Sequence, residues 1–71
     1  MSEELKLTLK AARQIKGLTQ GKAAEAIGIS VETLSNYERG KSFPDVRALK
    51  KIEKVYGVSY NNLIFLPSNY R

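Results

Sequence analysis

The feature that most constrains this chain is the stretch "TQGKAAEAIGISVETLSNYERG", residues 19–40, which holds two short helical patterns in close succession. Each begins at a residue that can cap a helix, Thr19 or Ser30, and each ends at a glycine, Gly28 or Gly40. Only a few residues lie between the two patterns. Two helices this short bury little apolar surface, so they need further helices to complete a core.

Similar signals predict three more helices, and the fold class is therefore all-α, a compact five-helix domain with no sheet. The residues expected to cap the five helices are Thr8, Thr19, Ser30, Asp45 and Ser59. The five segments are "TLKAARQIKG" (8–17), "TQGKAAEAIG" (19–28), "SVETLSNYERG" (30–40), "DVRALKKIEKVYG" (45–57) and "SYNNLIFLP" (59–67). Alternation at residues 5–7 favours an extended start to the chain.

Apolar residues at helical spacing predict the core. The expected core residues are Leu9, Ala12, Ile15 or Lys16, Ala23, Ala24, Ile27, Leu34, Tyr37, Val46, Leu49, Ile52 and Tyr56, with Leu63, Ile64 and Leu66 adding apolar mass. We expect one domain over residues 1–71, with a core from about residue 8 to residue 66 and loose termini.

Composition restricts the chemistry of the chain. It has 71 residues, a net charge of +5 and a pI near 9.7, which favours a polyanionic partner, either nucleic acid or a membrane surface. With neither cysteine nor histidine, the chain has no ordinary metal site and no nucleophile–base pair, so we expect no enzyme, cofactor, metal or small-molecule substrate. No apolar run spans a membrane and "MSEELKLTLK" is not a signal peptide, so we expect a cytoplasmic protein.

Residues 13–40 resemble the helix-turn-helix of the phage Cro/repressor-like (XRE-type) DNA-binding family. The resemblance rests on Thr19-Gln20, on Ala24, Gly28 and Leu34 at the family's spacing, and on the ending "YERGK" before a proline and another helix. It covers roughly residues 8–66 and implies a lambda-repressor-like fold, with the second and third helices as the helix-turn-helix. In this arrangement the helix at about 30–39 enters the major groove of double-stranded DNA, and its polar run "SVETLSN" suits that position.

The resemblance also implies roles for individual residues. The base-reading candidates are Val31, Glu32, Thr33 and Asn36, and the phosphate-binding candidates are Gln20, Arg39, Lys41, Ser42 and Arg47. Arg13 and Glu38 match a structural salt bridge of the family between its first and third helices. Lys50, Lys51 and Lys54 are expected to form a solvated helix face.

The expected function is sequence-specific transcriptional regulation of phage or mobile-element type, with a homodimer bound to DNA. Leu63, Ile64 and Phe65 exceed what a small core absorbs, and we expect them to form a partner surface. The alternative is a protein-interaction module on the same fold, either an antirepressor that binds a phage repressor or an antitoxin that binds a toxin.

Overall fold

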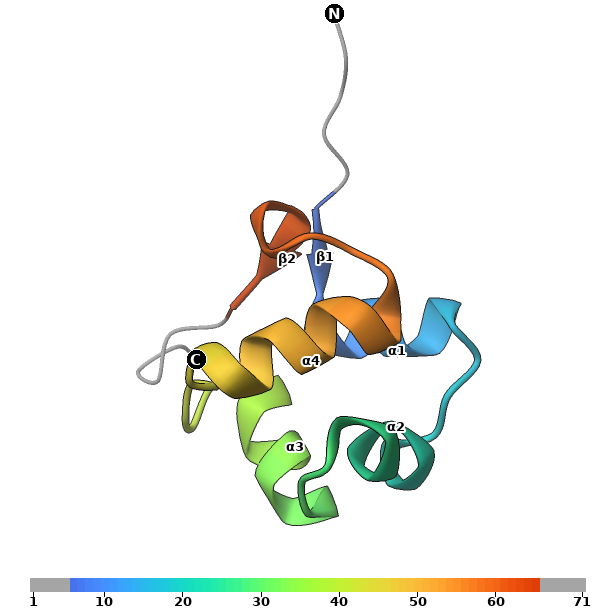
Figure 1. Ribbon diagram of the computed structural model, residues 1–71, viewed down its shortest axis with the longest axis vertical. Helices are drawn as coiled ribbons and strands as arrows, with labels where there is room; N and C mark the ends of the chain where they lie inside the picture. The colour runs from blue at the N-terminus through green and yellow to red at the C-terminus, as the bar shows by residue number, and fades with distance from the viewer. Residues whose placement is uncertain (1–5, 66–71) are drawn as a thin grey trace, which may run out of the picture.

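The computed structural model describes residues 6–65, which form four α-helices, one 3-10 turn and a pair of two-residue strands (Figure 1). The elements in chain order are β1 (Leu7–Thr8), α1 (Leu9–Ile15), α2 (Gln20–Ile27), α3 (Val31–Glu38), α4 (Val46–Tyr56), η1 (Tyr60–Asn62) and β2 (Leu63–Ile64). The expectations for residues 1–5, for Leu66 and Pro67, and for the tail 68–71 concern residues outside this range.

The predicted starts of the four α-helices are confirmed. The side-chain oxygens of Thr8, Thr19, Ser30 and Asp45 each accept a hydrogen bond from the backbone N–H three residues later. These bonds satisfy donors that the first helical turn leaves without a partner. At the end of α2, Gly28 has a φ of 92°, which side chains rarely adopt, so the chain turns there at little cost.

The predicted fifth helix is wrong over residues 59–65. Ser59 makes no capping hydrogen bond, residues 60–62 form a single 3-10 turn, and β2 then pairs in parallel with β1. Leu7 aligns with Leu63 and Thr8 with Ile64, so the extended start expected for the chain is present at Leu7. Two asparagines in the turn are weak helix formers, and the strand partner satisfies backbone groups that a helix would otherwise pair internally.

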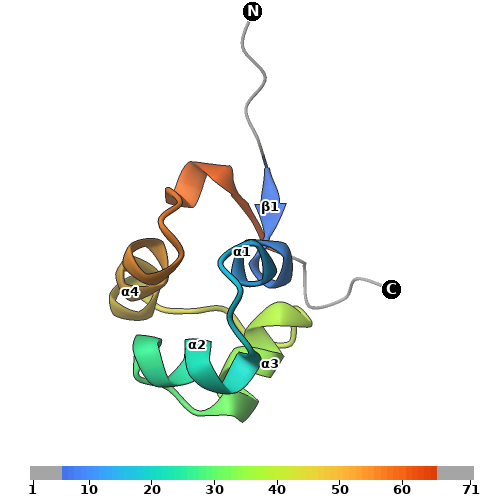
Figure 2. The ribbon, with the colours of Figure 1, turned by 90° about the vertical axis from the view of Figure 1, so that its right-hand side faces the viewer.

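The core lies where α1, α2, α3 and α4 meet, and it consists of Leu9, Ala12, Ala23, Ala24, Ile27, Leu34, Ile52, Tyr56 and Leu63. α2 contacts both α3 and α4, whereas α1 contacts α3 and the strand pair. In Figure 2, α4 lies at the left and α3 at the lower right, and α2 packs against both.

Two core predictions are wrong. Ile15 and Val46 are each 69% exposed, and Lys16 is exposed as well. Ile15 is the last residue of α1 and Val46 is the first residue of α4, so both lie at helix ends that extend beyond the packed region. Arg13 is buried on α1 instead.

Candidate nucleic-acid interface

The pair α2 and α3 presents a polar surface because its apolar residues face the core. Ala24 and Leu34 are almost completely buried, which fixes the inner sides of the two helices. Val31 and Glu32 are exposed at the start of α3, and Thr33 and Asn36 are half-buried. The four base-reading candidates therefore all keep some contact with solvent.

Two of these four candidates already make side-chain hydrogen bonds. The hydroxyl of Thr33 accepts a hydrogen bond of 2.8 Å from Ser30, whose own oxygen caps the helix. The Oδ1 atom of Asn36 accepts from Nη2 of Arg39 at 3.2 Å. The amide nitrogen of Asn36 donates in no hydrogen bond within residues 6–65. To pair with adenine through both amide atoms, the Oδ1 atom of Asn36 would have to release Arg39.

Beneath this surface, the carboxylate of Glu38 binds two other segments. Arg13 donates to it through Nε at 2.7 Å and through Nη2 at 3.2 Å, as a two-point salt bridge. The side chains are only 10% and 4% exposed, respectively. Arg13 also donates through Nη1 to the carbonyl of Leu18 at 3.0 Å. The pair expected from the sequence is thus present and links α1, the loop after it and α3.

Gln20 also donates to Glu38, through Nε2 to Oε1 at 3.0 Å. Its amide nitrogen was expected to hold a phosphate, and it is engaged here instead with the same carboxylate as Arg13. The side chain of Thr19 caps the backbone N–H of Lys22. The N–H groups of the residues before Lys22 point out of the start of α2, as they do at any helix N-terminus. Sequence spacing alone gave no sign of the bond between Gln20 and Glu38.

Burial and the charge of Glu38 shift the pKa values of Arg13 and Tyr56. The hydrogen bond to Glu38 raises the pKa of Arg13 above its usual value, so the guanidinium stays charged. Burial raises the pKa of Tyr56 to about 12, with a further contribution from Glu38. The Tyr56 hydroxyl is buried and has no hydrogen-bond partner in the described part of the chain.

An open groove borders Glu38 and its partners, and the exposed cations on its rim are Lys10 and Arg39. It is lined by Lys10, Arg13, Thr19, Gln20, Ser35, Glu38 and Arg39. Lys10 is exposed on α1, three residues before Arg13, and it was not among the predicted phosphate-binding residues. Its exposed position on α1, one helical turn before Arg13, places it on the rim of this groove.

The other phosphate candidates lie further along the chain. Lys41 and Ser42 are exposed just after α3, and their backbone N–H groups donate to the carbonyl of Asn36. Arg47 is exposed on α4, where it borders a different hollow together with Lys51. Arg39, Lys41 and Ser42 therefore follow the polar face of α3 directly, whereas Arg47 belongs to the surface of α4.

The family model described as "Helix-turn-helix" matches residues 9–63, which is most of the chain and includes all four α-helices. The chain belongs to this helix-turn-helix family.

Several curated relatives are similar to this family member. The HTH-type transcriptional regulator ImmR of Bacillus subtilis is 46% identical over 56 residues, which are 79% of this chain and 44% of the relative. The SPbeta prophage-derived uncharacterized HTH-type transcriptional regulator YonR of the same species is 38% identical, over 79% of this chain and 52% of the relative. The HTH-type transcriptional regulator PuuR of Escherichia coli is 37% identical, over 83% of this chain and 32% of the relative. The chain thus spans about a third to a half of these relatives.

The partner surface predicted for this helix-turn-helix chain needs one correction. Leu63 is only 7% exposed and belongs to the core, because β2 carries its side chain inward. Ile64 is exposed, and the ring of Phe65 lies 5.0 Å from Phe43 and 5.9 Å from Tyr60. We call Phe43, Tyr60 and Phe65 the aromatic cluster; its outer member Phe43 is 62% exposed.

Among residues 6–65, no group of three acidic, cysteine or histidine residues is arranged to hold a metal ion. None of the helices in this range is long and apolar enough to cross a membrane.

The buried carboxylate leads to a stability prediction. Replacing Glu38 with alanine leaves the Arg13 guanidinium buried without its partner, and removing one member of a buried pair costs about 3 kcal/mol. We expect equilibrium urea unfolding to show a loss of this size in the free energy of unfolding. The control is Glu25→Ala, which removes an exposed carboxylate from α2 and should change stability by less than about 0.5 kcal/mol. A Glu38→Ala midpoint equal to that of the wild type would contradict the structural role of the pair.

Proposed function

We propose that this chain binds double-stranded DNA in a sequence-specific manner and regulates transcription, with α2 and α3 as its helix-turn-helix and α3 in the major groove. The observation that carries the proposal is the outer face of α3, where Glu32, Thr33 and Asn36 keep contact with solvent beside the exposed Val31, while Leu34 anchors the inner face. A groove about 12 Å wide admits one helix whose polar side chains reach the base edges. The family match and the relatives named as transcriptional regulators support this function.

In this proposal, bases are read by Val31, Glu32, Thr33 and Asn36. Val31 and the methyl group of Thr33 suit a thymine methyl, Glu32 suits the amino group of cytosine, and Asn36 suits adenine. The bond from Arg39 holds the Asn36 amide in place before DNA arrives, and Arg39 is then free to move to a phosphate. No arginine is among these four residues, so readout of guanine is not part of the proposal.

Phosphates are bound on both sides of α3. On one side lie the N-terminus of α2 and Lys10, and on the other lie Arg39, Lys41 and Ser42. Glu38 contributes indirectly, because it holds Gln20 and thus the start of α2 in position. Phosphate contacts of this kind fix the register of the protein on the duplex, whereas the base contacts supply specificity.

The proposal extends to the biological setting. YonR is described as prophage-derived, which supports a regulator of phage or mobile-element type. The proposed activity is binding alone, with no catalytic step and no cofactor, and the absence of histidine and cysteine from the sequence is consistent with this.

DNA binding can be tested with duplexes selected from a random library. We expect log K to fall linearly with log salt, with a slope of about −3 if Lys10, Arg39 and Lys41 each neutralise one phosphate. Asn36→Ala should weaken binding to the selected site by about 1–3 kcal/mol and leave binding to random duplex almost unchanged. Lys41→Ala should weaken both and reduce the slope by about 1.

The control for these variants is Glu25→Ala, which alters an exposed residue of α2 outside the proposed contacts. Failure to select any duplex at low salt would contradict the proposal and favour the protein-interaction alternative. An equal loss by Asn36→Ala on selected and random duplexes would remove the base-reading role of α3.

We also propose that the chain binds DNA as a homodimer through the aromatic cluster, on two half-sites about 34 Å apart. One helix reads too few base pairs for useful specificity, and exposed apolar groups such as Phe43 and Ile64 mark a partner surface. Phe43→Ser should weaken association, measured by sedimentation with and without DNA, while circular dichroism shows an intact fold.

The matched control for the dimer is Ile15→Ser, which removes an apolar side chain of similar exposure from α1. A wild-type protein that stays monomeric at all concentrations, and also on its selected DNA, would contradict the dimer.

A further inference from the structure

The outer side of α4 carries four cations in one stripe. Arg47, Lys50, Lys51 and Lys54 follow the spacing i, i+3, i+4 and i+7, which places them on one side of the helix, and all four are exposed. We call them the basic face. None of them has a carboxylate within salt-bridge distance among residues 6–65, and neighbours of like charge at this spacing repel each other.

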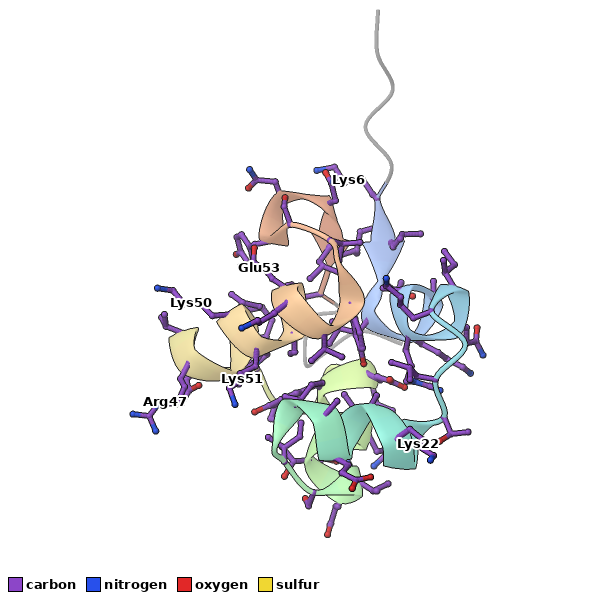
Figure 3. All side chains as sticks on the ribbon, turned by 45° about the vertical axis from the view of Figure 1, so that its right-hand side comes forward. Lys6, Lys22, Arg47, Lys50, Lys51 and Glu53 are labelled. Atoms are coloured by element: carbon purple, nitrogen blue, oxygen red, sulfur yellow. The ribbon has the colours of Figure 1, made fainter. Side chains whose placement is uncertain are left out.

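The single acidic residue of α4 does not balance this charge. Glu53 accepts a hydrogen bond from the backbone of Tyr60 and thus faces η1, and Figure 3 shows it apart from Arg47, Lys50 and Lys51. The carboxylate of Asp45, just before α4, caps the helix at Ala48 with a bond of 2.8 Å. The charge of the basic face is therefore left for an external partner.

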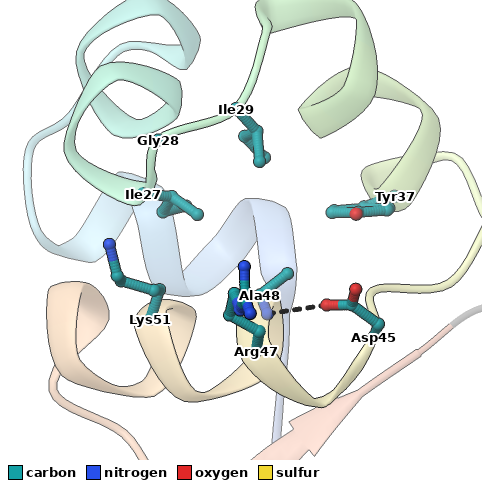
Figure 4. Close-up of a pocket in the computed structure, with 8 residues that line it drawn as sticks. All are labelled: Ile27, Gly28, Ile29, Tyr37, Asp45, Arg47, Ala48 and Lys51. Carbon is teal, nitrogen blue, oxygen red and sulfur yellow. Dashed lines mark hydrogen bonds between the residues drawn. The ribbon is translucent and has the colours of Figure 1, made fainter.

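A hollow of about 380 Å³ opens beside the basic face, between the end of α2, Tyr37 of α3 and the start of α4 (Figure 4). The side chains of Ile27, Ile29 and Ala48 supply the apolar part of its lining, and polar groups of Tyr37, Asp45, Arg47 and Lys51 supply the rest. Arg47 and Lys51 border the hollow and also line a shallow groove with Lys50 and Lys54. The hollow and the basic face thus form one continuous surface. The volume of the hollow lies near the lower end of the ~300–1,000 Å³ typical of ligand pockets.

We propose that this surface binds an acidic protein segment that inserts one apolar side chain into the hollow. The carboxylates of such a segment complement the basic face, and the lysine stems pack against its backbone. An apolar anchor suits the lining of Ile27, Ile29 and Ala48, which a phosphodiester chain would leave unused. Asp45 on the rim repels either kind of anion, so the apolar part of the hollow is what favours a protein segment over a second nucleic acid.

This proposal concerns residues other than the base-reading candidates; within the basic face, Arg47 alone is also a predicted phosphate-binding residue. The basic face lies on the outer side of α4, whereas the base-reading candidates lie on α3, so different helices form the two surfaces. An acidic partner bound at Lys50, Lys51 and Lys54 would leave the base-reading residues accessible.

The test uses a fluorescein-labelled ten-residue peptide of Asp and Glu with one central Phe, and the same peptide with Ser in place of Phe. Fluorescence anisotropy on the full chain should show that the Phe peptide binds about tenfold or more tightly than the Ser peptide. The double variant Lys51→Glu with Lys54→Glu should bind the Phe peptide about tenfold more weakly than the wild type. This variant should fold, because the new carboxylates lie four residues from Arg47 and Lys50.

The matched control is Lys10→Glu with Lys16→Glu, which makes the same change in net charge at exposed positions of and just after α1 and should retain most of the peptide affinity. No binding of the Phe peptide, or an equal loss in the control variant, would overturn the proposal. Equal affinity for the Phe and Ser peptides would overturn the role of the hollow. A loss of duplex DNA affinity in the α4 variant as large as its loss of peptide affinity would overturn the assignment to a protein partner.

Discussion

The arrangement of this domain depends on one buried carboxylate. Glu38, the last residue of α3, accepts hydrogen bonds from Arg13 on α1 and from Gln20 at the start of α2. An eight-residue helix is unstable by itself in water, so α3 keeps its place only through contacts with its neighbours. Replacing a buried ion pair with apolar residues is often neutral for stability, which suggests that this pair contributes mainly to the orientation of the helices. The same carboxylate thereby fixes the orientation of the polar face of α3.

In the α2–α3 pair, the residues that hold the helices in place differ from those exposed on the outer side of α3. Leu34 and Ala24 provide packing on the inner side of the α2–α3 pair, and the buried ion pair adds directionality at one end. The outer side of α3 is then free to carry polar groups that contribute little to the core. α4 packs against α2 with one side and leaves its basic side exposed, so the two proposed binding surfaces belong to different helices.

The parts of the fold predicted from the sequence are those set by short-range chemistry. The caps at Thr8, Thr19, Ser30 and Asp45 depend on a hydrogen bond that reaches only three residues ahead. The prediction of a fifth helix was wrong because β2 pairs with β1, which lies more than fifty residues away in the sequence. A strand of two residues, such as β2, is too short to leave a periodic pattern. That pairing also turns Leu63 into the core. At the site, the resemblance to a family supplied the pair of Arg13 and Glu38, but the bond from Gln20 to Glu38 depends on a helix crossing that spacing does not reveal.

We propose that α3, held in place by Glu38, is the surface that meets DNA. The most direct test is to titrate the ¹⁵N-labelled protein with a duplex selected from a random library and to record the amide chemical shifts. We expect the largest changes at the start of α2, from Gln20 to Lys22, and along residues 31–36, with small changes at Lys50 and Lys54. Unchanged amides at residues 31–36 under conditions where the duplex is bound would contradict the account.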